Sequence, residues 1–199
     1  ETVDLIDTSK FTIEQRRRPT EAELQKYVRF AASDDGISPL SHPGMAGGAY
    51  LASGIEHNES GAPSASGAVH TRMNEKRFKK FNPLKERTDL VRTFGDPKAP
   101  LGLVAWGSLA GVCQEAMERA NARGLRVKLL VPILLYPFVE GPFRDFFATL
   151  ENGLVVEQSH QGQLYRLMRM FLDVPKGLGS FCKSGANPIT PTCLLYTSR

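Results

Sequence analysis

The second half of the chain alternates between short apolar runs and longer segments with apolar residues at helical spacing. The runs at residues 101–106, 125–131 and 154–157 are flanked by Gly, Pro or polar residues, which is typical of buried strands. A weaker run at 179–183 indicates a fourth strand. The pattern therefore predicts four strands with a helix between each pair.

Three apolar stripes at helical spacing predict these helices. The stripes consist of Leu109, Val112, Cys113, Ala116, Met117 and Ala120; of Phe143, Phe146, Phe147 and Leu150; and of Leu164, Leu167, Met168, Phe171 and Leu172. Ser108 is placed to cap the first helix, and Gly124 to end it in a left-handed conformation. Pro142 suits the first position of the second helix.

Strands joined by crossover helices predict an α/β fold, with a mostly parallel open sheet and helices on both of its faces. The strand at 125–131 carries Arg126 and Lys128 at alternate positions, which indicates a place nearer the sheet edge. Ligands of such sheets usually bind beyond the carboxyl ends of the strands. The corresponding segments are residues 106–108, 136–141 and 158–162.

Residues 1–98 lack this regular alternation. The apolar opening at residues 3–6 is consistent with the end of a strand. Thr20 and Glu23 have the spacing of a capping box, which predicts the start of a short helix running through Phe30.

A segment rich in Gly, Pro and Ser follows at residues 34–67 and predicts a long irregular loop. Compact domains seldom hold such a loop without a functional or interface reason. Residues 66–87 favour a polar, basic helix that ends near Pro83 and lies across a surface.

The net charge of +4 over 199 residues is mildly basic. The dense basic patches at residues 16–18 and 76–87 are interspersed with Glu, so a solvated helix face is a better interpretation than a nucleic-acid site. The apolar run at 129–136 is far shorter than the ~20 residues that cross a bilayer. We therefore expect neither nucleic acid nor membrane as a partner, and the opening residues show no secretion leader.

The cysteines Cys113, Cys182 and Cys193 are far apart in the sequence. Zinc and iron–sulfur sites need several thiolates at fixed spacing, so neither site is expected on this chain. Scattered cysteines in odd number also favour a reducing cytoplasm over a disulfide framework. Cys113 is expected to be a small buried hydrophobic residue.

Three polar clusters are candidate sites. The turn at Ser108 could offer helix amides to an anion, although an ordinary serine cap is favoured. Glu157 and His160 could form an acid–base pair, although a loop with a capping role is favoured. In the cluster at residues 54–61, His57 could bind a metal, but a hydrogen-bonded histidine that fixes the loop is favoured because ligand spacing is absent.

No cluster supplies a nucleophile, and there is no phosphate-binding loop motif. The sequence therefore predicts no catalytic residue and no metal ligand on this chain. His57, Ser108, Gly162 and Gln163 are the candidate residues for contact with a ligand or another subunit.

Several of these segments resemble the alpha subunit of 2-oxoacid:acceptor (ferredoxin) oxidoreductases, and within that family the 2-oxoglutarate branch. The resemblance rests on order and spacing rather than on one motif, and it runs to about Pro191. The matching segments are residues 47–50, 54–61, 76–80, 106–108, 115–116, 124, 137–138, 162–164 and 185–190.

The resemblance implies an enzyme that decarboxylates a 2-oxoacid with thiamine diphosphate and magnesium, captures the acyl group on coenzyme A, and passes electrons to ferredoxin. It implies that the cofactor is bound mostly by segments upstream of Glu1 and by a partner beta subunit. The iron–sulfur cluster would lie on another chain, and this fragment alone would bind no cofactor.

By the same resemblance, residues 1–98 are the irregular end of a thiamine pyrimidine-binding domain with a linker and a basic helix. Residues 99–191 are a transketolase C-terminal-like domain that serves structure and subunit packing. Residues 192–199 depart from the family and are expected to be an extraneous tail. The alternatives are the pyruvate or branched-chain branch, or a non-catalytic α/β module that binds a small ligand.

Overall fold

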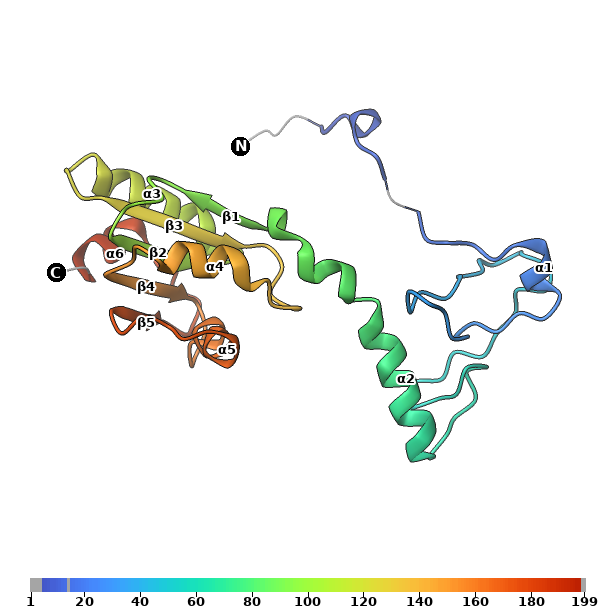
Figure 1. Cartoon of the computed structure of the whole chain (residues 1–199). Coiled ribbons are helices and arrows are strands. Elements are labelled where there is room, and N and C mark those ends of the chain that lie inside the picture. Colours follow the sequence, from blue (N-terminus) through green and yellow to red (C-terminus); the bar gives the residue numbers. More distant parts are fainter. Residues whose placement is uncertain (1–4, 14, 198–199) are drawn as a thin grey trace. The chain divides into compact units, whose positions relative to one another are not determined.

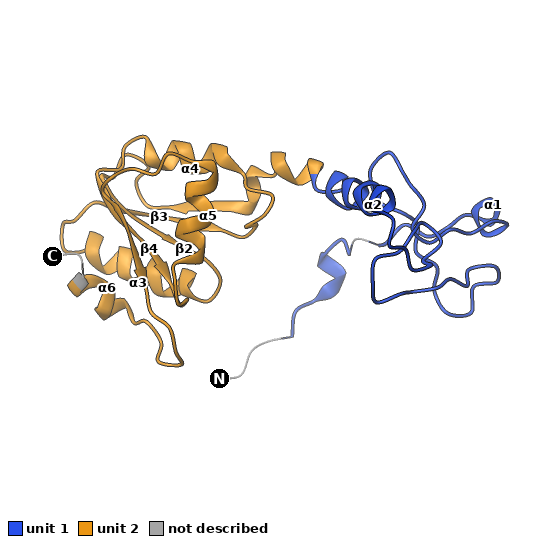
Figure 2. Ribbon diagram, turned by 90° about the horizontal axis from the view of Figure 1, so that it is seen from below, with its two compact units in different colours: residues 1–81 blue, residues 82–199 orange. Residues whose placement is uncertain are grey.

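The computed structural model of the chain describes residues 5–13 and 15–197. It divides into two compact units, residues 1–81 and 82–199, which we call unit 1 and unit 2 (Figure 2). None of the described helices is long and apolar enough to span a bilayer.

Unit 2 contains a five-stranded sheet with the strand order β1-β3-β2-β4-β5 (Figure 1). The strands are β1 (Val91–Phe94), β2 (Leu101–Ala105), β3 (Val127–Pro132), β4 (Asn152–Glu157) and β5 (Leu178–Cys182). β1 is antiparallel to β3, whereas all other pairs are parallel. The prediction of a mostly parallel α/β sheet is therefore confirmed.

Helices cover both faces of this sheet, as predicted. They are α3 (Leu109–Asn121), α4 (Glu140–Phe147), α5 (Gln163–Phe171) and α6 (Pro191–Thr197). The connection from β2 to β3 and that from β3 to β4 run in opposite directions, so right-handed crossovers place α3 and α4 on opposite faces.

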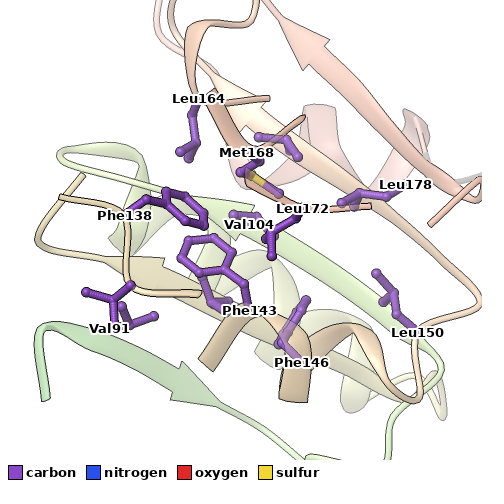
Figure 3. Close-up of a cluster of buried hydrophobic side chains, with 13 residues drawn as sticks. Val91, Val104, Phe138, Phe143, Phe146, Leu150, Leu164, Met168, Leu172 and Leu178 are labelled. Carbon is purple, nitrogen blue, oxygen red and sulfur yellow. The ribbon is translucent and has the colours of Figure 1, made fainter. Parts of the chain in front are cut away.

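The core consists of two layers, one on each face of the sheet. Phe143 of α4 and Met168 of α5 pack with Val104 of β2 on one face (Figure 3). Cys113 of α3 packs with Leu129 of β3 on the other face. The predicted stripes thus form the core, and the strands are apolar on both sides because each face is covered.

The environment of Lys128 corrects the sequence prediction, although the position of its strand agrees with it. β3 is next to the edge strand β1 and nearer the edge than the central strand β2, but Lys128 is buried, with only 2% of it exposed. Its Nζ donates to the carbonyl oxygens of Phe146 at 2.6 Å and Pro97 at 3.1 Å, and to Oγ1 of Thr149 at 2.7 Å. Burial lowers the pKa of Lys128, and these acceptors offset the loss of water.

Two helix-boundary predictions also need correction. The side chain of Ser108 makes no capping hydrogen bond, and its own backbone is already helical. α4 begins at Glu140, so Pro142 is its third residue rather than its first. The end of α3 is as predicted: Gly124 has φ +85°, and the Leu125 amide donates to the carbonyl of Ala120 at 3.2 Å.

Unit 1 contains two α-helices in its described residues, α1 (Glu21–Leu24) and α2 (Gly67–Lys79). The capping box of Thr20 and Glu23 is present, but α1 ends at Leu24 and does not reach Phe30. In the predicted opening strand, residues 3 and 4 lie outside the described part, and Leu5 and Ile6 are not in a strand.

The basic helix expected over residues 66–87 is α2, which Ser66 caps by accepting from the Val69 amide. It stops at Lys79, and a separate 3₁₀ helix covers Asn82–Glu86 at the start of unit 2.

The core of unit 1 is very small. Apart from prolines, Met73 is the one buried hydrophobic side chain among its described residues. Many large apolar side chains are instead exposed, namely Leu5, Ile6, Phe11, Ile13, Ile37, Tyr50, Leu51, Ile55 and Phe78. Polar contacts within the loops and with α2 therefore supplement this small core.

The backbones of β2 and β4 approach closely at Gly153, and a substitution there tests how the two strands are paired. A Cβ added at Gly153 would lie 2.4 Å from the carbonyl oxygen of Gly102 on the neighbouring strand. Because a backbone atom cannot move aside, we expect Gly153→Ala to lower the free energy of unfolding by ~1–3 kcal/mol. Gly111→Ala on α3 meets no atom within 4 Å and should raise it by ~0.5–1 kcal/mol. Urea unfolding of the two variants measures both changes in the free energy of unfolding. The same change in both variants would contradict the pairing register of β2 and β4.

Candidate functional site

The carboxyl ends of the parallel strands form one edge of the unit 2 sheet. The chain leaves β2 toward β3 and leaves β4 toward β5, so the turns after these two neighbouring strands diverge. Ligands of open α/β sheets bind at such a point. The structure thus brings the turns at Ser108 and Gly162 to adjacent strand ends, although they are far apart in the sequence.

The turn after β4 is organised by a buried carboxylate. Glu157 is 0% exposed, and its Oε1 accepts from the Leu164 amide at 2.7 Å while its Oε2 accepts from the Tyr165 amide at 3.1 Å. Gly162, with φ +65°, turns the chain into α5. The carboxylate occupies the place at the helix N-terminus that an external anion would take.

This geometry favours the capping interpretation of Glu157 over the acid–base pair. Both of its oxygens bind amides of α5, whereas the side chain of His160 is exposed. Gln163, the first residue of α5, is exposed as well. Gln163 is therefore accessible to another molecule, while Gly162 is buried beneath the turn.

The turn after β2 is open to solvent. Gly107 has φ +60°, and a Cβ there would meet no atom within 4 Å. Ser108 is exposed, and Trp106 beside it is 38% exposed. Ser108 does not cap α3 with its side chain, and the Ala110 amide instead donates to the carbonyl oxygen of Gly107 at 3.1 Å.

The polar cluster of unit 1 is built around Glu56. Its Oε2 lies 3.0 Å from Nη2 of Arg77 and 2.5 Å from Nδ1 of His70, and both of these residues belong to α2. The guanidinium of Arg77, and then His70, lower the pKa of Glu56 to about 2. Glu56 thereby connects the loop at residues 54–61 to α2.

His57 lies beside this contact but takes part in a different one. Its Nδ1 is 2.9 Å from the carbonyl oxygen of Asn58, and its ring centroid is 4.1 Å from that of Phe30. These contacts favour the loop-fixing interpretation of His57.

His70 was missed by sequence reasoning, which assigned it no role. A signal was available, because His70, Asn74 and Arg77 are spaced as one face of a helix and a carboxylate precedes them in the loop. The contact between Glu56 and α2 was not predicted because Glu56 is 14 positions before His70 in the sequence.

The side chains of the described residues do not form a metal site, and Cys113 is not a reactive thiol. Among the residues described here, no three His, Cys, Asp or Glu side chains converge as metal ligands. Burial raises the pKa of Cys113 to about 12, which keeps its thiol protonated. The residues present do not fit magnesium diphosphate, so no reaction step is derived through that group on this chain.

No family model matches the chain. The similar proteins are alpha subunits of one class of enzyme. It is 31% identical over 187 residues, 92% of its length, to subunit alpha of 2-oxoacid:ferredoxin oxidoreductase 2 from Aeropyrum pernix. It is 28% identical over 145 residues, 71% of its length, to the corresponding alpha subunit from Saccharolobus solfataricus. The chain spans about a quarter of these relatives, 28% and 23% of their lengths.

A solved structure shares the fold almost throughout. It is a 2-oxoglutarate:ferredoxin oxidoreductase from Magnetococcus marinus with 2-oxoglutarate, coenzyme A and succinyl-CoA bound. The match has a TM-score of 0.81 and 33% identity, and it covers 97% of this chain and 33% of that one. The chain is thus similar to one stretch of the alpha subunits of 2-oxoacid:ferredoxin oxidoreductases. This is the class of enzyme that the sequence resemblance implied.

The role of Glu157 can be tested by substitution. Glu157→Ala leaves the amides of Leu164 and Tyr165 without their acceptor, so we expect the free energy of unfolding to fall by ~1–3 kcal/mol. His160→Ala is the control and should leave stability unchanged, because the side chain is exposed. A larger effect at His160 than at Glu157 in urea unfolding would contradict the capping role.

The contact between Glu56 and Arg77 predicts a pH dependence. Because the folded pKa of Glu56 lies below the usual 4.5, the contact stabilises unit 1 above pH 4.5 and is lost as the pH falls toward 2. A carbon-13 NMR titration of the Glu56 carboxyl should give a midpoint near 2, rising toward 4.5 in Arg77→Gln but not in Arg16→Gln. A midpoint near 4.5 in the unaltered chain would show that the contact is absent.

Proposed function

We propose that the chain is part of the alpha subunit of a 2-oxoacid:ferredoxin oxidoreductase. Such an enzyme oxidatively decarboxylates a 2-oxoacid to an acyl-CoA and passes the electrons to ferredoxin. The observation that carries the proposal is the 31% identity along 92% of the chain, supported by a shared fold with a TM-score of 0.81.

Within this family we propose 2-oxoglutarate as the 2-oxoacid. The support is the 33% identity to a protein whose structure holds 2-oxoglutarate and succinyl-CoA. The pyruvate and branched-chain branches remain the alternatives that a substrate series would distinguish.

The part of the subunit described here serves structure and subunit packing. Its buried carboxylate caps a helix, and the many exposed apolar side chains of unit 1 are available for contact with other parts of the enzyme. His57, Ser108, Gly162 and Gln163 are the proposed contact residues. Thiamine diphosphate and magnesium would be held mostly by upstream segments and by a beta subunit, the iron–sulfur cluster by another chain, all in the cytoplasm.

The domain assignment follows from the same proposal. Residues 1–98 would end the pyrimidine-binding domain, and residues 99–191 would be the transketolase C-terminal-like domain. The compact unit begins earlier, at Asn82, because β1 joins the sheet of unit 2. The proposed extraneous tail at 192–199 forms most of α6, where Leu194 is 4% exposed and packs against the core.

The proposal is tested by expressing the full-length gene with its beta partner. We expect coenzyme A-dependent reduction of a dye with 2-oxoglutarate, faster than with pyruvate or a branched-chain 2-oxoacid. No activity with any 2-oxoacid would reject the proposal, and a preference for another 2-oxoacid would reject only the 2-oxoglutarate branch.

Residues 1–199 alone should show no turnover in the same assay, because the described part provides no cluster of side chains that could hold magnesium. The matched control is the full-length complex at equal concentration. Dye reduction by the isolated chain would contradict the packing role.

A further inference from the structure

A small cavity lies in unit 1 beside the carboxyl-terminal turn of α2. Its volume is about 260 Å³. Four of its lining residues carry a positive charge, namely Arg29, Lys76, Arg77 and Lys80, and none of the described lining residues is Asp or Glu. All of its lining residues belong to unit 1.

The four cations come from two separate segments. Lys76, Arg77 and Lys80 are at the end of α2, where the helix dipole favours positive charge. Arg29 is in the loop after α1, and its guanidinium lies 5.0 Å from the centroid of the Phe30 ring. The dipole of α2 explains the first three residues but not why a fourth cation from another segment faces the same space.

Neighbouring groups of the chain neutralise this charge only in part. Arg77 is paired with Glu56. Lys76 donates from Nζ to the carbonyl oxygen of Phe30 at 2.9 Å and to the hydroxyl of Ser38, which are both uncharged acceptors. Burial, and then the nearby Arg29, lower the pKa of Lys76, while Glu59 partly offsets the shift. The described lining residues include four cations and no carboxylate, so the charge around the cavity remains positive in excess.

The walls of the cavity strengthen its attraction for an anion. Met73 is 2% exposed, and the rings of Phe30 and His57 pack 4.1 Å apart at their centroids. Such apolar walls reduce the local dielectric constant and focus the field of the cations into the cavity.

We propose that this cavity binds a small molecule with two or more negative charges, either a phosphate ester or a dicarboxylate. The planar guanidinium of Arg29 matches the paired oxygens of either group, and Lys80 adds a further positive charge to the lining. A volume of about 260 Å³ suits a compact anion rather than a large cofactor.

Hydrogen exchange of the full 199-residue chain, followed by mass spectrometry, tests the proposal. Pyrophosphate and glutarate are the two probes, each compared with sodium chloride at equal ionic strength. A bound anion should slow exchange in residues 29–38 and 70–80 but not in unit 2, because a ligand stabilises the structure that binds it.

Two adjacent lysines provide a matched pair of variants. Lys80 lines the cavity and Lys79 does not, yet both are exposed at the end of α2. We expect Lys80→Gln to weaken binding of the anion about tenfold and Lys79→Gln to leave it nearly unchanged.

The two probes distinguish the ligand classes. Slower hydrogen exchange with pyrophosphate alone assigns a phosphate ester, and slower exchange with glutarate alone assigns a dicarboxylate. Slower exchange with both probes supports the chemistry that they share. No protection by either probe, or equal weakening in the two variants, would overturn the proposal.

Discussion

The burial of β2 on both faces is the constraint on which unit 2 depends. β2 lies between β3 and β4, and its residues Val104 and Ala105 are fully buried on opposite sides of the sheet. A strand that is apolar on both faces must be covered twice, so the chain needs helices on each side. The two crossover directions that satisfy this need also place the turns after β2 and β4 together at one edge.

The regular part of this architecture could be predicted because its signals are local. Apolar spacing along single segments predicted α3, α4 and α5, and it predicted that the strands alternate with them. β1 was missed because it is four residues long and carries Arg92 and Thr93. Lys128 was misjudged because its acceptors, such as Phe146 and Thr149, are far away in the sequence and only the folded chain brings them to its ammonium.

The candidate site shows the same division between local and distant signals. The capping role of Glu157 depends on residues only a few positions ahead, and the sequence favoured it. The contact of Glu56 with His70 and Arg77 joins a loop to a helix, and the sequence indicated the shared helix face of His70 and Arg77 but not their pairing with Glu56. The cationic cavity of unit 1 could not be predicted, since Arg29 reaches it from a separate segment.

The central claim is that unit 2 is a self-contained folding unit whose core provides structure. The most direct test compares urea unfolding of residues 82–199 with that of the whole chain. Trp106, the single tryptophan, follows β2 and reports on this unit by its fluorescence. We expect one cooperative unfolding transition, with the same urea midpoint in residues 82–199 as in the whole chain. Loss of cooperativity, or a clearly lower midpoint, in residues 82–199 would contradict it.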